Sequence, residues 1–179
     1  MSAILTDVAG PAGAGRESVT ARGAAAPRAG ALSTAALVAA AFSLSAGLVH
    51  FVYAPEHWWL WVPYGLFFLG AGLGQTALAV LLVARRVGAW IASLAIAGNL
   101  GIIVLYAISR TPYGAPVGPM RGHAELPRLA DMGTTAGELV TVIALLAFLP
   151  RRAARWASTL LLLAGAALWW LRLTDRLVY

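Results

Sequence analysis

The sequence predicts an all-α integral membrane protein, a bundle of five transmembrane helices with the N-terminus inside the cell and the C-terminus outside. The first observation is composition: 60% of the 179 residues are hydrophobic and 11% are charged, whereas a soluble domain is about 45–50% apolar and about 25% charged. A disordered chain is excluded as well, because it needs low hydrophobicity and high charge. The second observation is five apolar runs close to the roughly 20 residues that cross a bilayer. The third is the placement of the arginines.

The apolar runs divide the chain into a tail, a membrane domain and a short end segment. Residues 1–30 are rich in Ala and Gly and have no apolar period, so we expect a disordered cytoplasmic tail. The five-helix domain is expected at 31–174, with spans at about 31–53, 57–83, 87–109, 132–150 and 156–174. Residues 175–179 would form a short extracytoplasmic tail. A cleaved signal peptide ending near 43–46 is the alternative for the first span, although the apolar run continues past that point.

The arginines predict the orientation, because cytoplasmic loops carry the excess of positive charge. With the N-terminus inside, eight arginines fall inside and five outside. The inside set includes the short turns at 85–86 and 151–155. This pattern indicates a multi-pass protein of the cell (plasma) membrane whose first partner is the lipid bilayer. Another membrane subunit or a second copy of the chain stays open as a partner. Nucleic acid is excluded, because the arginines flank apolar runs and do not cluster on a soluble module.

The predicted outer side gathers the groups that can bind metals. All three histidines fall there, together with four carboxylates: His50, His57, His123, Glu56, Glu125, Asp131 and Glu138. Imidazoles with carboxylates suit zinc, copper or iron, so one hypothesis is a metal site at the outer face. Haem, with His50 and His57 as axial ligands, is the weaker variant because both flank one short turn. Cysteine is absent, which excludes thiolate sites.

A second hypothesis is a metal-free site for a small molecule or lipid, as in a permease or an enzyme. Two helical stripes of polar residues would line it: His57, Tyr64 and Gln75 in the second span, and Asn99, Tyr106 and Arg110 in the third. Arg110 would bind an anionic group of the ligand. Gly70 and Gly74 predict a GxxxG helix-packing face. A third hypothesis makes all of these residues structural, in an accessory membrane subunit, and whether the chain is an enzyme stays open.

Glu138 has two interpretations. Thr135 and Glu138 fit a capping box at the start of the fourth span. Alternatively, the carboxylate is unusual enough inside an apolar span to need a partner, and by depth we expect it within reach of His50, His57 or Arg110. The connection at 110–130 contains four prolines and three glycines, so we expect a stiff lid above this site, with His123 and Glu125 in it.

Three segments carry a resemblance to a known group. They are SRTPYGAPVGP (109–119) with the acidic residues that follow it, HxxxxxxHW (50–58) and GLFFLGAGLGQ (65–75). They resemble uncharacterised small multi-pass membrane proteins of high-GC bacteria that carry an SRTxxGxPxGP-type loop followed by acidic residues. The resemblance covers about residues 47–150. It implies the same membrane architecture and an outer-face site, and it implies no activity.

Overall fold

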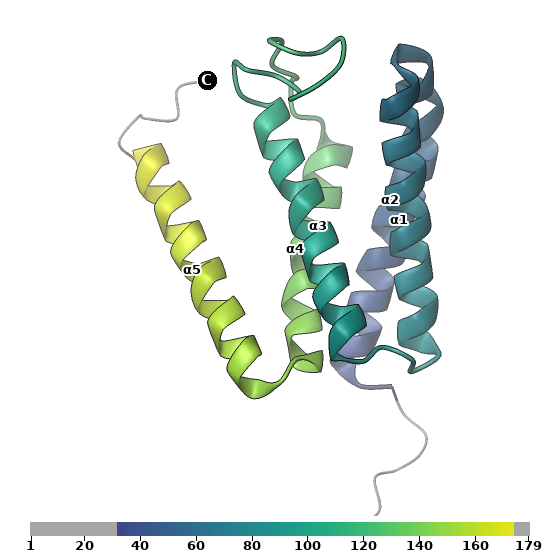
Figure 1. Ribbon diagram of the computed structural model, residues 1–179, viewed down its shortest axis with the longest axis vertical. Helices are drawn as coiled ribbons and strands as arrows, with labels where there is room; N and C mark the ends of the chain where they lie inside the picture. The colour runs from purple at the N-terminus through teal and green to yellow at the C-terminus, as the bar shows by residue number, and fades with distance from the viewer. Residues whose placement is uncertain (1–31, 174–179) are drawn as a thin grey trace, which may run out of the picture. The chain divides into compact units, whose positions relative to one another are not determined.

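The computed structural model describes residues 32–173, which form helices and connecting loops (Figure 1). The helices are α1 (Thr34–Leu60), α2 (Val62–Val83), α3 (Ala89–Ser109), α4 (Leu129–Leu145), the 3-10 turn η1 (Leu146–Phe148) and α5 (Arg151–Leu173). Within residues 32–173, four helical segments are long and apolar enough to cross a membrane: α1, α2, α3 and Leu129–Phe148. The two predicted tails lie outside the described residues.

The junction of α1 and α2 differs from the prediction. α1 continues through Pro55 to Leu60, and the chain breaks at Trp61, whose φ of −168° and ψ of 123° are extended. Pro63 lies in the first turn of α2, where a proline costs no helical hydrogen bond. The second helix therefore starts at Val62, five residues after the start at about residue 57 that we expected from the sequence. His57 belongs to α1, so the predicted stripe of His57, Tyr64 and Gln75 on one helix is wrong.

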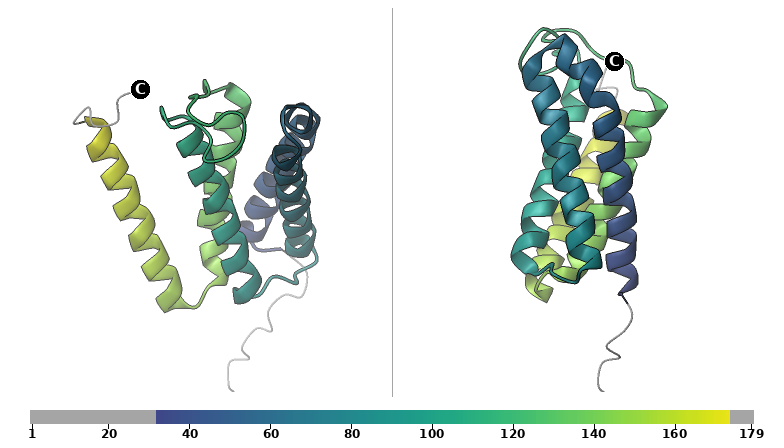
Figure 2. Two further views of the ribbon diagram at one scale, coloured as in Figure 1. Left: turned by 45° about the horizontal axis from the view of Figure 1, so that its top comes forward. Right: turned by 90° about the vertical axis from the view of Figure 1, so that its right-hand side faces the viewer.

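Small side chains bring the helices together. α1 packs against α2 and α4, and α3 packs against α4 (Figure 2). A Cβ on Gly47 of α1 would lie 2.8 Å from Thr76 Oγ1 and 3.0 Å from the carbonyl oxygen of Gly72. Close backbone approach at small residues is the usual way for membrane helices to associate. The core beneath this contact is mainly aliphatic: Ala36, Ala39, Ala40, Leu78, Ala79, Leu82, Ala92, Ile96, Val142 and Leu145.

The predicted packing role of Gly70 and Gly74 is wrong. A Cβ on either glycine would meet nothing within 4 Å. The close contact with α1 is made by Gly72, whose Cβ would lie 2.8 Å from the Phe51 ring. Residues two positions apart on a helix do not face the same way, so α2 turns Gly72 toward α1 and leaves Gly70 and Gly74 on open surface.

The start of α4 also differs from the prediction. The helix begins at Leu129, three residues before the expected start, and the Asp131 carboxylate accepts a hydrogen bond from the Arg128 backbone N–H at 3.3 Å. Asp131 therefore makes the contact back to the helix start that the capping-box interpretation gave to Glu138. Glu138 lies two turns further along α4 and faces the interior of the bundle.

Candidate functional site

Four polar side chains from four helices meet inside the apolar bundle. They are His50 of α1, Gln75 of α2, Asn99 of α3 and Glu138 of α4, with exposed fractions of 6%, 4%, 4% and 1%. We call this group the buried cluster. Each residue was singled out in the sequence, and the fold brings all four together.

Hydrogen bonds from Gln75 connect the buried cluster. Its Nε2 donates to Glu138 Oε1 at 2.8 Å and to Asn99 Oδ1 at 3.4 Å. Asn99 Nδ2 donates to the carbonyl oxygen of Ala95 at 2.8 Å. Ser43 Oγ donates to the Gln75 carbonyl oxygen at 2.8 Å and so ties α1 to α2. The cluster therefore links α1, α2, α3 and α4 through polar contacts as well as through packing.

Glu138 also approaches a histidine, as its depth predicted. His50 Nε2 lies 3.5 Å from Glu138 Oε1, which is longer than a good hydrogen bond. The expected approach of Glu138 to His50 is confirmed. Both residues are buried.

Four atoms at or beside the buried cluster have no hydrogen-bond partner among residues 32–173: His50 Nε2, Gln75 Oε1, Thr76 Oγ1 and Glu138 Oε2. A buried polar atom without a partner typically costs about 1–3 kcal/mol. Such atoms are uncommon in folded proteins and often mark a functional site. Thr76 was not singled out in the sequence, where its only signal is its position next to Gln75.

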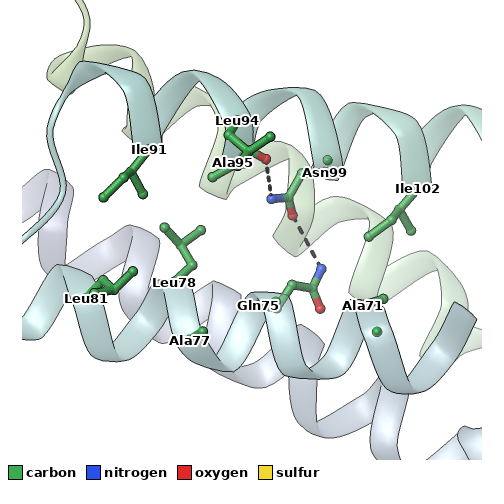
Figure 3. Close-up of a pocket in the computed structure, with 13 residues that line it drawn as sticks. Ala71, Gln75, Ala77, Leu78, Leu81, Ile91, Leu94, Ala95, Asn99 and Ile102 are labelled. Carbon is green, nitrogen blue, oxygen red and sulfur yellow. Dashed lines mark hydrogen bonds between the residues drawn. The ribbon is translucent and has the colours of Figure 1, made fainter. Parts of the chain in front are cut away.

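A groove between α2 and α3 reaches the buried cluster (Figure 3). Its volume is about 320 Å³. Gln75 and Asn99 point toward one another across it, and Leu78, Leu94 and Ile102 are among its apolar walls. Three glycines, Gly70, Gly74 and Gly98, also line the groove, and a Cβ on any of them would meet nothing within 4 Å. Because glycine has no side chain, these three positions leave the groove open.

His57 lies near the buried cluster without contacting Glu138. Its Nδ1 is 2.9 Å from the Tyr53 carbonyl oxygen, and its ring stacks on Phe68 with the ring centroids 3.7 Å apart. The centroid of Phe68 is also 5.3 Å from that of His50. The phenyl ring thus contacts both imidazoles, and His57 is held by its own helix and by this ring.

Arg110 forms a separate ionic network with the loop that follows α3. Its Nη1 pairs with Glu125, its Nη2 donates to Asp131 Oδ2 at 2.7 Å, and its guanidinium lies 4.5 Å from the Tyr106 ring centroid. Burial acts to lower the pKa of Arg110, but hydrogen bonds to Glu125 and Tyr106 and the charges of Glu125 and Asp131 raise it above its ordinary value. Arg110 is therefore already paired with two carboxylates of the chain. We expected it to bind an anionic group of a ligand, but its contacts in the structure are with these carboxylates.

The loop is anchored on the start of α2. Tyr64 donates a hydrogen bond to the Val117 carbonyl oxygen. Gly118, with φ of +83°, sits so close to Tyr64 and Trp61 that a Cβ would lie within 2.7 Å of both side chains. The backbone N–H of Glu125 also donates to the Ser109 carbonyl oxygen at 3.0 Å. Tyr64 thus holds the loop and does not line the groove with Gln75.

The seven predicted metal ligands are distributed over several places. Within residues 32–173 no three His, Asp or Glu side chains gather in a way that could hold a metal ion. Glu125 and Asp131 are drawn to Arg110, and Glu56 lies 3.6 Å from Arg128. His123 is exposed in the loop. Only His50 and Glu138 approach each other as expected.

Comparison with protein-family models, curated proteins and solved structures gives no match. Among the described residues, the features that bear on function are the buried cluster, which links four helices, and the groove beside it.

Proposed function

We propose that this chain is a multi-pass protein of the plasma membrane that binds a small lipid-soluble molecule in the groove between α2 and α3, without a metal. The observation that carries the proposal is the contact between groove and cluster. Gln75 and Asn99 line an otherwise apolar groove, and Gln75 is hydrogen-bonded to the buried Glu138. Ligand sites typically have volumes of about 300–1,000 Å³ and combine apolar walls with few polar groups, and this groove has both properties.

The buried cluster favours binding over a purely structural role. A polar or ionisable residue inside a membrane span is costly and usually functional. Packing alone would be served by apolar residues at these four positions, and it would not leave Gln75 Oε1 without a partner in the described chain. Binding in the groove would be the first step both of transport by a permease and of catalysis by an enzyme.

The proposed orientation places the N-terminus in the cytoplasm and the loop between α3 and α4 outside. The short turns that contain Arg85, Arg86 and Arg151 then face the cytoplasm, as the positive-inside rule requires. α5 serves as the fifth span. Its 23 residues extend about 34 Å, enough for the roughly 30 Å hydrocarbon core.

Filling the groove tests the proposal. The protein in lipid nanodiscs is exposed to decane that carries a photoreactive diazirine, and labelled residues are identified by mass spectrometry. We expect adducts at Leu94 and Ile102, and a several-fold loss of them in Gly98→Leu. The matched control is Gly101→Leu, because Gly101 lies on the same helix, has the same open space and does not line the groove.

Two results would contradict the proposal. One is labelling spread evenly over lipid-facing residues outside the groove, such as Val80 and Leu105. The other is an equal effect of Gly98→Leu and Gly101→Leu on adducts at Leu94, which would mean that the groove is ordinary bilayer-exposed surface.

A further inference from the structure

We infer that His50 and Glu138 form a proton-binding site inside the helix bundle and hold one exchangeable proton between them. The ligand of this site is the proton itself. The inference goes beyond the proposed function, because it rests on the contact between these two side chains and does not depend on what the groove between α2 and α3 binds.

The two side chains come from different helices and meet in the apolar interior. His50 of α1 is 6% exposed, Glu138 of α4 is 1% exposed, and His50 Nε2 lies 3.5 Å from Glu138 Oε1. Neither His50 Nε2 nor Glu138 Oε2 has a hydrogen-bond partner within the described residues. Each residue therefore offers an atom that can carry a proton, beside a second group that can take it up.

Net charge decides how many protons the pair holds. With no proton to share, Glu138 is a carboxylate beside a neutral imidazole. With two, His50 is an imidazolium beside a neutral carboxyl. Both states leave one uncompensated charge among apolar side chains, which is costly. A single proton gives no net charge, whether it is bonded to His50 Nε2 or to the Glu138 carboxyl, so the surroundings favour the one-proton state.

The helices packed around the pair bring no counter-charge to it. α2 and α3 contain no Asp, Glu, Lys, Arg or His, and they place two neutral amides, Gln75 and Asn99, in the buried cluster. The other carboxylate of α4, Asp131, pairs with Arg110, whose guanidinium also lies over the Tyr106 ring.

The remaining ionisable side chains at the outer end of α1 and α2 have partners elsewhere. Glu56 lies 3.6 Å from Arg128. His57 Nδ1 is 2.9 Å from the Tyr53 carbonyl oxygen, and Tyr64 donates to the loop. None of these contacts involves Glu138, so within the described part of the chain the pair has to balance its own charge.

The proton can leave without breaking a hydrogen bond within the pair. The 3.5 Å between His50 Nε2 and Glu138 Oε1 is longer than an N–H···O hydrogen bond of about 2.7–3.2 Å. Glu138 Oε1 accepts from Gln75 Nε2 at 2.8 Å, and a carboxylate is a stronger acceptor than a neutral carboxyl. Proton occupancy therefore changes the strength of the bond that holds Gln75, which also lines the groove.

Two spectroscopic signals count the proton on the full-length protein in lipid nanodiscs. Nitrogen-15 NMR of labelled histidine distinguishes imidazolium from neutral imidazole at His50. Infrared spectroscopy distinguishes carboxyl from carboxylate at Glu138. At pH 7 we expect one of the two groups, and not both, to be protonated. This proton should be lost reversibly as the pH is raised to about 10, within the range recorded for buried acids and bases.

Substitution of either partner should move the proton to a predictable place. In Glu138→Gln we expect His50 to be a neutral imidazole at pH 7, because an imidazolium would have no counter-charge. In His50→Gln we expect Glu138 to keep the proton as a neutral carboxyl. His57→Gln is the matched control, because His57 lies on the same helix without contacting Glu138, and it should leave the proton count at one.

The outcomes are distinct. A Glu138 carboxylate beside a neutral His50 at pH 7, or a carboxyl beside an imidazolium, overturns the inference, because the pair then holds no proton or two. A proton that stays in place at about pH 10 overturns it as well, since it is then not exchangeable. If Glu138→Gln or His50→Gln does not fold, the wild-type spectra still decide, because His57→Gln and His123→Gln assign the other two histidine signals and exposed carboxyl groups are ionised at pH 7. The proton count does not depend on labelling of the groove, so this inference and the proposed function can fail separately.

Discussion

At the scale of single residues, Glu138 holds the buried cluster together. It accepts a hydrogen bond from Gln75 and lies beside His50, so one carboxylate joins side chains of α1, α2 and α4. Its approach to His50 could be predicted because position along a helix determines depth in the membrane. The pairing of Glu125 and Asp131 with Arg110 could not be predicted in the same way. It depends on the side of the bundle on which Arg110 lies, and helix packing determines that side.

Replacing Glu138 should separate its polar role from its volume. Glu138→Leu leaves Gln75 Nε2 without its acceptor, and we expect a loss of about 1–3 kcal/mol in the free energy of unfolding. Glu138→Gln keeps an acceptor oxygen and the same shape, so its loss should stay below about 1 kcal/mol. Denaturant unfolding in detergent measures both. Equal stability of Glu138→Leu and wild type would mean that the carboxylate has no structural partner.

Arg110 offers a prediction with a defined pH dependence. Arg110→Met removes both ionic contacts to Glu125 and Asp131, and we expect a loss of about 1.5–3 kcal/mol, as for hydrogen bonds to charged groups. The pKa of Arg110 is higher in the folded state than in the unfolded state. The contribution of its charge to the free energy of unfolding is therefore complete at pH values below the unfolded-state pKa, and it is lost only as pH rises through the folded-state pKa. The difference between wild type and Arg110→Met that is due to the arginine charge should therefore be constant from about pH 6 to 9.

Thermal unfolding at several pH values checks this. Arg121→Met serves as the control, because Arg121 is an exposed arginine of the same loop. A destabilisation of Arg110→Met no larger than that of Arg121→Met would show that the network is an exposed, weak ion-pair cluster.

At the scale of helices, α1 and α2 depend on a few small residues and one proline. Both helices were predicted from the sequence, but the break between them was misplaced. From the sequence alone, Pro55 and Pro63 are equally able to interrupt a helix. At the first turn of α2 the missing N–H of Pro63 costs no helical hydrogen bond, whereas Pro55 lies inside α1. The packing glycine was likewise misassigned, because the pattern at 70–74 does not say which face of α2 meets α1.

Two alanine substitutions test this packing. Gly47→Ala introduces a Cβ 2.8 Å from Thr76 Oγ1 and 3.0 Å from the Gly72 carbonyl oxygen, so we expect a loss of about 1–3 kcal/mol from overpacking. Gly70→Ala meets nothing within 4 Å and should stabilise α2 by up to about 1 kcal/mol. Thermal unfolding in detergent compares them. The opposite ranking would restore the GxxxG interpretation of Gly70.

At the scale of the whole molecule, the groove follows from which helices are neighbours. α1 packs against both α2 and α4, and α3 packs against α4, so a space remains between α2 and α3 although they are consecutive in the chain. Polar positions on each helix can be read from the sequence, but the order of helices around a bundle cannot, because every span is apolar on several faces. The sequence therefore suggested that Gln75 and Asn99 line one site, but it did not show that the groove excludes Tyr64, Tyr106 and Arg110.

Reporter fusions test the proposed number and direction of the spans. Fusions after Arg86 and Arg155 should be cytoplasmic, because these arginine-rich turns resist translocation, and a fusion after Tyr179 should be extracytoplasmic. Alkaline phosphatase, active only outside, and green fluorescent protein, fluorescent inside, give complementary signals at each site. A cytoplasmic Tyr179 with the other two unchanged would mean that α5 returns or lies along the membrane surface and the bundle has four spans. Reversed signals at all three sites would instead place the loop that pairs Arg110 with Glu125 in the cytoplasm, contrary to the charge asymmetry of the chain.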